Sequence, residues 1–150
     1  MITIYTDGGC SPNPGKGSWA FIAIKDEEET IRSGCIGQAT NNICELTAAI
    51  EALKYAASLG EDDVSLYLDS NYVKLGITEW IPIWTNPKPG RRAWITAGGN
   101  PVKNQELWVQ LQALSVSFKH ISWNWVKGHN GDHYNEMVDM EVVRARNTSK

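Results

Sequence analysis

The sequence predicts an α/β fold, in which a five-stranded mixed sheet has three antiparallel strands followed by two parallel ones and carries helices on both faces. Two apolar runs, 2–6 and 64–68, each end in an aspartate and enclose a helical pattern, as parallel strands joined by a crossover helix do. Alternating apolar and polar residues over 18–25 and 30–36 indicate a hairpin. A last strand pattern, 121–126, is followed by a helical one.

The first half of the chain contains three strands and one long helix. The run 2–6 is the first strand, and the hairpin, whose strands are separated by an acidic turn, completes an antiparallel meander with it. The crossover helix runs from Asn42 to about Gly60, because apolar residues recur there at helical spacing. These residues are Ile43, Leu46, Ile50, Leu53 and Ala57. A right-handed crossover then places the strand 64–68 beside the first strand.

The second half begins with a short helix over 71–80, after which prolines and glycines interrupt regular structure as far as Pro101. Apolar spacing predicts a helix over 107–118, capped by Asn104. The strand 121–126 follows, and a polar loop leads to a C-terminal helix from about Asn135. Repeats and linkers are lacking in the sequence, so we expect one domain over 1–150.

Composition disfavours several classes of protein. The sequence contains no apolar stretch near the roughly 18 residues of a membrane span and no basic leader before a hydrophobic core, so we expect a cytoplasmic protein. The three cysteines lack C-x-x-C spacing, which disfavours a disulfide framework and a zinc ribbon. A net charge of −3 disfavours polyphosphate partners, yet the segment 85–104 has four basic residues and no acid. That segment is suited to face phosphates.

Four acidic residues are expected to converge at the carboxyl edge of the sheet. Asp7 and Asp69 end neighbouring parallel strands, and two such charges about 4 Å apart repel by several kcal/mol at a dielectric near 20. Glu45 lies in the first turn of the crossover helix, and Asp139 lies near the start of the last helix, from where both can reach this edge. Oxygen ligands of this kind suit Mg²⁺ or Mn²⁺, and a shared site can hold two ions for phosphoryl displacement.

Each of these acids has an ordinary structural explanation when taken alone. Asn42-x-x-Glu45 also fits a helix capping box, and Asp69 is also a plausible N-cap of the helix after it. Asp139 is also a plausible first-turn acid that favours the helix dipole. The simultaneous fit of all four to one spaced pattern favours the metal site.

Four motifs carry a resemblance to a known family, and they are YTDGG, TNNICE, YLDSNY and VKGHNGDHYNEMVDM, in this order. Together they resemble the type 1 ribonuclease H family from about Ile2 to Arg146. The resemblance implies a ribonuclease H-like fold and an endonuclease that cuts the RNA strand of an RNA/DNA hybrid with little sequence preference. It also implies two Mg²⁺ ions, replaceable by Mn²⁺, and products with 5′-phosphate and 3′-hydroxyl ends. We expect a monomer without an obligate protein partner.

The resemblance assigns roles to individual residues. Asp7 matches the carboxylate that bridges both ions, Glu45 and Asp69 match ligands of the ion on the leaving-group side, and Asp139 matches a ligand of the ion that activates water. His129, in the loop 128–131, matches a mobile histidine that assists proton transfer or product departure. A histidine titrates near neutral pH, which suits either task.

The resemblance also implies contacts with the substrate. Asn13, Asn41 and Asn42 match positions in the hybrid groove, and Asn71 stands where glutamine is common. Thr40 and Asn104 resemble a pocket for a phosphate of the DNA strand, although capping is an equal alternative for each. The segment at about 80–104 resembles a basic handle that tracks the DNA strand, with Trp84, Trp94, Arg91 and Arg92 as contact residues. The alternative for the tryptophans is core packing, which we favour for Trp80.

Some positions depart from the family pattern, and other functions compete with this one. Gln38 and Ile43 stand where basic residues are common, so we expect modest affinity for the hybrid. Another nuclease of the same superfamily would keep the acids at different spacings, and a hybrid-binding module without activity would lose at least one of them. A nucleotide-binding domain would need a glycine-rich loop that opens a helix, whereas the loop 11–17 leads into a strand pattern.

Overall fold

A five-stranded sheet forms the centre of the computed structural model, which describes residues 1–87, 89–90, 92–96, 99–126 and 133–148. The strand order is β3-β2-β1-β4-β5. The strands are β1 (Ile2–Ser11), β2 (Gly15–Lys25), β3 (Glu28–Ala39), β4 (Asp63–Leu68) and β5 (His120–Trp125). β1 pairs antiparallel with β2, and β2 with β3, while β1 pairs parallel with β4, and β4 with β5. The predicted mixed sheet is confirmed.

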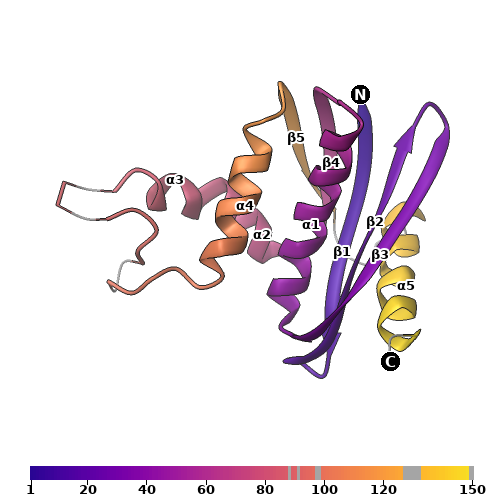
Figure 1. Cartoon of the computed structure of the whole chain (residues 1–150), viewed down its shortest axis with the longest axis horizontal. Coiled ribbons are helices and arrows are strands. Elements are labelled where there is room, and N and C mark those ends of the chain that lie inside the picture. Colours follow the sequence, from indigo (N-terminus) through magenta and orange to yellow (C-terminus); the bar gives the residue numbers. More distant parts are fainter. Residues whose placement is uncertain (88, 91, 97–98, 127–132, 149–150) are drawn as a thin grey trace.

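Helices cover both faces of this sheet. They are α1 (Asn41–Ser58), α2 (Asn71–Leu75), the π-helix η1 (Gly76–Trp80), α3 (Ile81–Trp84), α4 (Gln105–Ser115) and α5 (His133–Thr148). α1 and α4 lie on one face, α5 lies on the other, and the chain between α3 and α4 projects away from the body of the molecule (Figure 1). In the part of the chain that the structure describes, every helix is too short or too polar to cross a bilayer.

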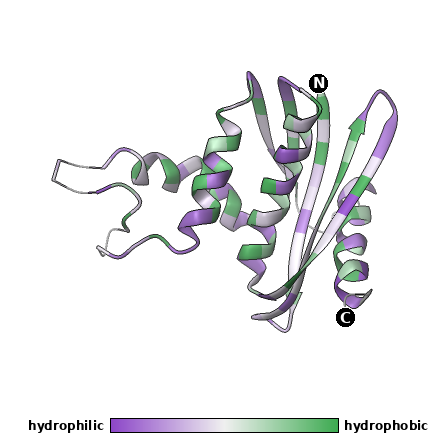
Figure 2. Cartoon of the chain, viewed as in Figure 1, coloured by the Kyte–Doolittle hydropathy of each residue, from purple (hydrophilic) through white to green (hydrophobic). Residues whose placement is uncertain are grey.

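The two helical layers pack on very different amounts of apolar surface. On the α1 and α4 side, a large core joins β1, β4 and both helices, and Leu46, Leu53, Leu66, Trp108 and Leu111 in it are fully buried. On the α5 side, the buried cluster consists of Ala20, Ile22, Val138 and Val142. Figure 2 shows both apolar and polar residues along α1, and the buried residues of this helix, among them Leu46, Ile50 and Leu53, belong to the large core. Burial of apolar surface therefore fixes α1 more firmly than α5.

β1 extends further than the apolar run predicts. Its pairing with β2 continues to Ser11↔Lys16, whereas its pairing with β4 ends at Tyr5↔Tyr67. The prediction that the strand ends at Asp7 was therefore wrong, because β2 supplies hydrogen bonds to the more polar second half of β1. At Asp7, β1 therefore still pairs with β2 on one side but no longer pairs with β4 on the other.

Two predicted caps also differ from the structure. The N-cap of α1 is Thr40, whose hydroxyl accepts a hydrogen bond from the backbone N–H of Ile43 at 3.2 Å, so Asn42 does not cap this helix. Asn104 does occupy the N-cap position of α4, but it has φ 59° and its side chain makes no capping hydrogen bond. Its amide nitrogen instead donates to the Tyr72 hydroxyl at 3.2 Å.

The Tyr72 hydroxyl joins α2 to α4 inside a group of aromatic rings. It accepts hydrogen bonds from the Asn104 amide and from the indole N–H of Trp108, the latter at 3.1 Å. Trp80 and Trp84 pack edge-on against Trp108, and Trp94 lies 6.0 Å from Trp84 between ring centroids. The tryptophans at the start of the projecting segment therefore pack against the large core.

We expect Tyr72→Phe to lower the free energy of unfolding by about 1–3 kcal/mol, because it leaves the fully buried Trp108 N–H without an acceptor. Urea unfolding followed by tryptophan fluorescence measures this loss. Tyr55→Phe is the matched control, since the structure gives the half-buried Tyr55 hydroxyl no hydrogen bond among the described residues. Equal losses in the two variants would contradict a specific role for the Tyr72 hydroxyl.

Candidate metal centre

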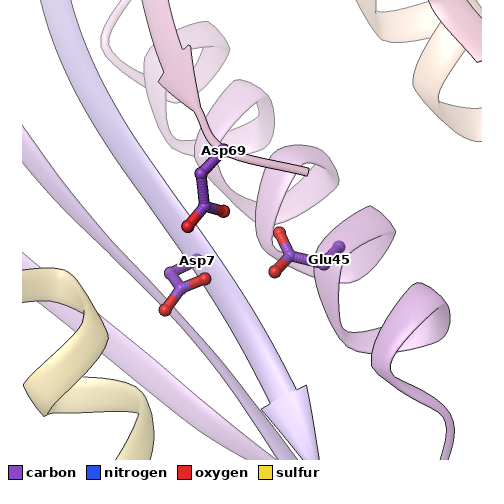
Figure 3. A group of neighbouring side chains, drawn as sticks. All are labelled: Asp7, Glu45 and Asp69. Carbon is purple, nitrogen blue, oxygen red and sulfur yellow. The ribbon is translucent and has the colours of Figure 1, made fainter. Parts of the chain in front are cut away.

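Three carboxylates meet at the point where β1 and β4 separate. Asp7, Glu45 and Asp69 each present an oxygen atom, and these atoms all lie within 4.8 Å of one another. The side chains come from β1, from α1 and from the residue after β4, and they point toward one another (Figure 3). Within the described part of the chain, no other group of acidic, histidine or cysteine side chains approaches in this way.

The parallel register of β1 and β4 places Asp7 beside Asp69. The paired residues run from Ile2↔Val64 to Tyr5↔Tyr67, and the same offset continued for two residues brings the two aspartates level. β4 ends at Leu68, and the Asp69 side chain after it points toward Asp7 (Figure 3). Ser70, not Asp69, caps α2, because its hydroxyl accepts from the backbone N–H of Val73 at 3.2 Å. The capping explanation for Asp69 is therefore excluded.

Glu45 reaches the aspartates because α1 lies directly against β1 at Gly8. A Cβ atom on Gly8 would lie 2.3 Å from the carbonyl oxygen of Cys44, which no side chain tolerates. The backbone of Gly8 also hydrogen-bonds the Glu45 carboxylate. Glu45 is the fifth residue of α1, so its predicted place in the first turn was wrong by less than one turn.

Gly8 was not among the predicted site residues, although the sequence contains a signal for it. A glycine within a strand pattern often marks a close approach of another backbone, and the chain carries two glycines directly after Asp7. This close approach is what brings the second turn of α1 to the edge of the sheet.

Asp139 lies on α5, at the side of the three acids. It lines the same cavity as Asp7, and both its hydrogen bond and its charge contribute to the raised pKa of Asp7. Because α5 begins at His133 and not at Asn135, Asp139 lies in the second turn of the helix. The alternative explanation of Asp139 as a first-turn acid that favours the helix dipole therefore does not apply. The structure thus brings the four predicted carboxylates to one cavity. Asp7, Glu45 and Asp69 have oxygen atoms that all lie within 4.8 Å of one another.

Burial and mutual repulsion raise the pKa values of Asp7 and Glu45 and make these two acids hard to ionise. Asp7 is 6% exposed, and burial, reinforced by the charge of Asp69 and the hydrogen bond with Asp139, raises its pKa to about 8. Burial and the charges of Asp7 and Asp69 raise the pKa of Glu45 well above its ordinary value. A divalent cation would remove this repulsion, and an all-oxygen donor set fits Mg²⁺ or Mn²⁺.

We expect the metal-free protein to lose stability as the pH rises from about 4 to about 8. The pKa of Asp7 is 3.8 in its unperturbed state and about 8 in the fold, so the folded state keeps a proton that the unfolded state releases in this window. The stabilisation is complete below the lower pKa and disappears toward the upper one. Denaturant unfolding in chelator at pH 5 and pH 8 measures the difference, and Mg²⁺ should restore stability mainly at pH 8, because it binds deprotonated carboxylates.

Asp7→Asn is the control for this pH dependence, because an amide does not titrate in this range. Its stability in chelator should change less between pH 5 and pH 8 than that of the parent protein. An unchanged slope in the variant would contradict the assignment of the pH dependence to Asp7.

The cavity over the carboxylates has a volume of about 530 Å³ and contains several of the predicted substrate residues. Asn41, Asn42 and Asn71 line it, together with Cys10 and Arg146, which sequence reasoning did not single out. Asn41 is held by backbone hydrogen bonds and by a weak one from the Cys10 thiol to its side-chain oxygen at 3.4 Å. Its side-chain oxygen accepts from the backbone N–H of Cys10 at 2.9 Å, and its own backbone N–H donates to the side-chain oxygen of Asn13 at 3.2 Å.

Other predicted contact residues lie away from this cavity or outside the described part of the chain. Thr40 caps α1, which is the structural alternative for it, whereas the Asn104 side chain binds Tyr72 and makes no capping hydrogen bond. Contact of Thr40 and Asn104 with a phosphate of the DNA strand stays a prediction. Trp84 and Trp94 are half-buried and pack on the core, while Arg92 is exposed. His129 and Arg91 lie outside the described residues.

Comparisons with known proteins agree on one family. The family model described as RNase H matches residues 1–147. A Ribonuclease H of Xanthomonas oryzae pv. oryzae is 48% identical over 146 residues, which cover 97% of this chain and 90% of that protein. A Ribonuclease H of Polaromonas naphthalenivorans is 51% identical over 140 residues, with coverage of 92% and 82%. The crystal structure of RNase H1 from Halobacterium salinarum matches with a TM-score of 0.74 and 25% identity, covering 99% of this chain and 98% of that one.

Proposed function

The chain belongs to the ribonuclease H family of hybrid-degrading ribonucleases, and we propose that it hydrolyses the RNA strand of RNA/DNA hybrids with two divalent cations. The observation that carries this proposal is the convergence of Asp7, Glu45 and Asp69, from three separate elements, to within 4.8 Å of one another. Such a group of acids is unfavourable in a fold without a cation, so its presence in a cavity points to metal-dependent chemistry.

The four carboxylates would share the ions between them. Asp7 interacts with Glu45, Asp69 and Asp139, so it would be the acid that helps to hold both ions. Bound Mg²⁺ lowers the pKa of water and neutralises charge on a leaving oxygen. The protein holds its donors on rigid elements: β1 fixes Asp7, α1 fixes Glu45, and the hydrogen bond from Gly8 orients the Glu45 carboxylate. Hydrolysis would leave 5′-phosphate and 3′-hydroxyl ends.

Recognition of the hybrid would use the asparagines at the rim of the cavity. The side-chain oxygen of Asn41 is occupied by Cys10, so its amide N–H groups are the part of the side chain available to a sugar hydroxyl or phosphate. Asn42 and Asn71 flank the same opening. Contacts to the 2′-hydroxyl distinguish RNA from DNA without reading the base sequence. Roles for Asn13, Trp84, Trp94, Arg91, Arg92 and His129 stay predictions, as do a monomeric state and a cytoplasmic location.

The decisive experiment compares end-labelled RNA/DNA, RNA/RNA and DNA/DNA duplexes with the purified protein, in Mg²⁺ and in chelator. We expect cleavage of the RNA strand in the hybrid alone, and only with metal. Treatment of the products with phosphatase and ligase identifies their ends. Equal cleavage of DNA/DNA, or cleavage of the hybrid in chelator, would overturn the proposal.

A further inference from the structure

The helix that carries Asp139 packs on the sheet through a small apolar cluster and through hydrogen bonds to β2 and β3. The four buried residues of the small cluster between α5 and β2 provide only a limited apolar surface, and apolar contacts have no preferred direction. Side chains from the sheet also form directional hydrogen bonds with α5. They come from Ser18 on β2 and from Glu29, Ser33 and Cys35 on β3.

Ser18 has the most constrained of these bonds. It is fully buried, and its hydroxyl donates to the backbone carbonyl oxygen of Val142 at 2.5 Å. Val142 lies three residues after Asp139, about one turn along α5. Ser18 pairs with Gly9 across the sheet, and its neighbour Ala20 pairs with Asp7. The bond therefore connects the turn of α5 next to Asp139 with the part of the sheet that holds Asp7.

The other bonds act further from Asp139 or through flexible groups. Ser33 donates to the Glu141 carboxylate at 2.8 Å, and this long side chain also binds the exposed Arg144. The exposed Cys35 donates a weak S–H hydrogen bond to the Ala145 carbonyl at 3.1 Å, and Ala145 lies about one turn beyond Val142. The exposed Glu29 carboxylate accepts a hydrogen bond from the Tyr134 hydroxyl at 2.9 Å, in the first turn of α5. None of these bonds joins a buried side chain to the backbone beside Asp139.

We propose that Ser18 is a positioning residue. Its hydrogen bond to the Val142 carbonyl fixes the position of α5 along the helix axis and thereby holds Asp139 against Asp7 for cation binding. This inference rests on the proposed function, because it takes Asp139 as a cation ligand. Metal sites and in-line displacement depend on ligand positions to well under 1 Å, so a small slide of α5 weakens the site without unfolding the protein.

Ser18→Ala removes this bond with almost no change in side-chain volume. We expect Mn²⁺ binding by the free protein, measured by electron paramagnetic resonance and calorimetry, to weaken by about three- to tenfold, the range of one net hydrogen bond. The Mg²⁺ concentration for half-maximal hybrid cleavage should rise by a similar factor, with little change in KM for the hybrid at saturating Mg²⁺. Ser33→Ala is the matched control and should bind Mn²⁺ like the parent protein.

A double-mutant cycle separates positioning from general stability. In an Asp139→Asn background, Ser18→Ala should have no further effect on Mn²⁺ binding, because the ligand that it positions is already lost. Ser18→Cys keeps the size and a weak donor, so it should bind Mn²⁺ with intermediate affinity, and it serves as the test if Ser18→Ala does not fold.

Two outcomes have different meanings. The positioning role would be overturned if the Ser18→Ala protein folds and binds Mn²⁺ as tightly as the parent protein. It would also be overturned if Ser18→Ala weakens Mn²⁺ binding by the same factor in the Asp139→Asn background as in the parent protein. Either result would leave the proposed function intact. A parent protein that binds no Mn²⁺ at all would instead overturn the proposed function.

Discussion

Asp7→Asn should lower the rate of hybrid cleavage by about a thousandfold or more and, in chelator at pH 8, should raise the free energy of unfolding. The loss of activity follows because, in the proposed function, Asp7 would help to hold both cations, each of which would supply several kcal/mol to the transition state. The gain in stability follows because the amide removes one of several mutually repelling acids without changing the shape of the side chain.

The gain should shrink at pH 5, where the parent protein holds a proton on Asp7 and the repulsion is already reduced. Urea unfolding at both pH values, together with single-turnover cleavage, measures the two effects. Asp62→Asn is the control, because this acid is exposed in the turn before β4 and should change neither quantity appreciably. A loss of several kcal/mol by Asp7→Asn in chelator would mean that Asp7 is a structural hydrogen-bond acceptor.

Gly8→Ala should abolish most cleavage and destabilise the fold by about 1–3 kcal/mol or more, as overpacking against a rigid neighbour does. The new methyl group would lie 2.3 Å from the Cys44 carbonyl oxygen and 2.7 Å from the Glu45 backbone nitrogen, both of which are fixed in α1. Relief requires α1 to move away from β1, and this movement takes Glu45 from the aspartates.

Gly37→Ala is the control for this experiment, because Gly37 also lies in a strand and an added Cβ there meets no atom within 4 Å. Thermal unfolding and Mg²⁺-dependent cleavage are measured for both variants. Parental activity and stability of Gly8→Ala would show that the contact between α1 and β1 does not determine the position of Glu45.

Much of this arrangement could be predicted because strand pairing depends on short-range patterns. The spacing of apolar residues predicted that β1 and β4 are a parallel pair. Because an aspartate follows the apolar run of each strand, this pairing brings Asp7 and Asp69 together independently of the loop conformations. The helical spacing after Asn42 likewise predicted that the start of α1 would come near that edge, although Glu45 lies in its second turn and not in its first.

The differences arise where tertiary contacts outweigh local preference. β1 continues past Asp7 because β2 supplies a partner strand, which the polar sequence after Asp7 does not reveal. Thr40 takes the capping role from Asn42 because β3 ends at Ala39 and the chain turns one residue earlier than the apolar spacing indicates. Asn104 adopts φ 59° and binds Tyr72, a residue far away in the sequence. Contacts of this kind cannot be deduced from spacing.

The proposed centre is assembled from elements at both ends of the polymer, and this has a consequence for the protein during its own synthesis. A ribosome releases Asp7 first and Asp139 long after it, and until α5 docks on β2 the acids on β1, α1 and after β4 lack their fourth member. A nascent chain would therefore be harmless to nearby nucleic acid, and hydrolytic capacity would begin only when translation has delivered its final helix.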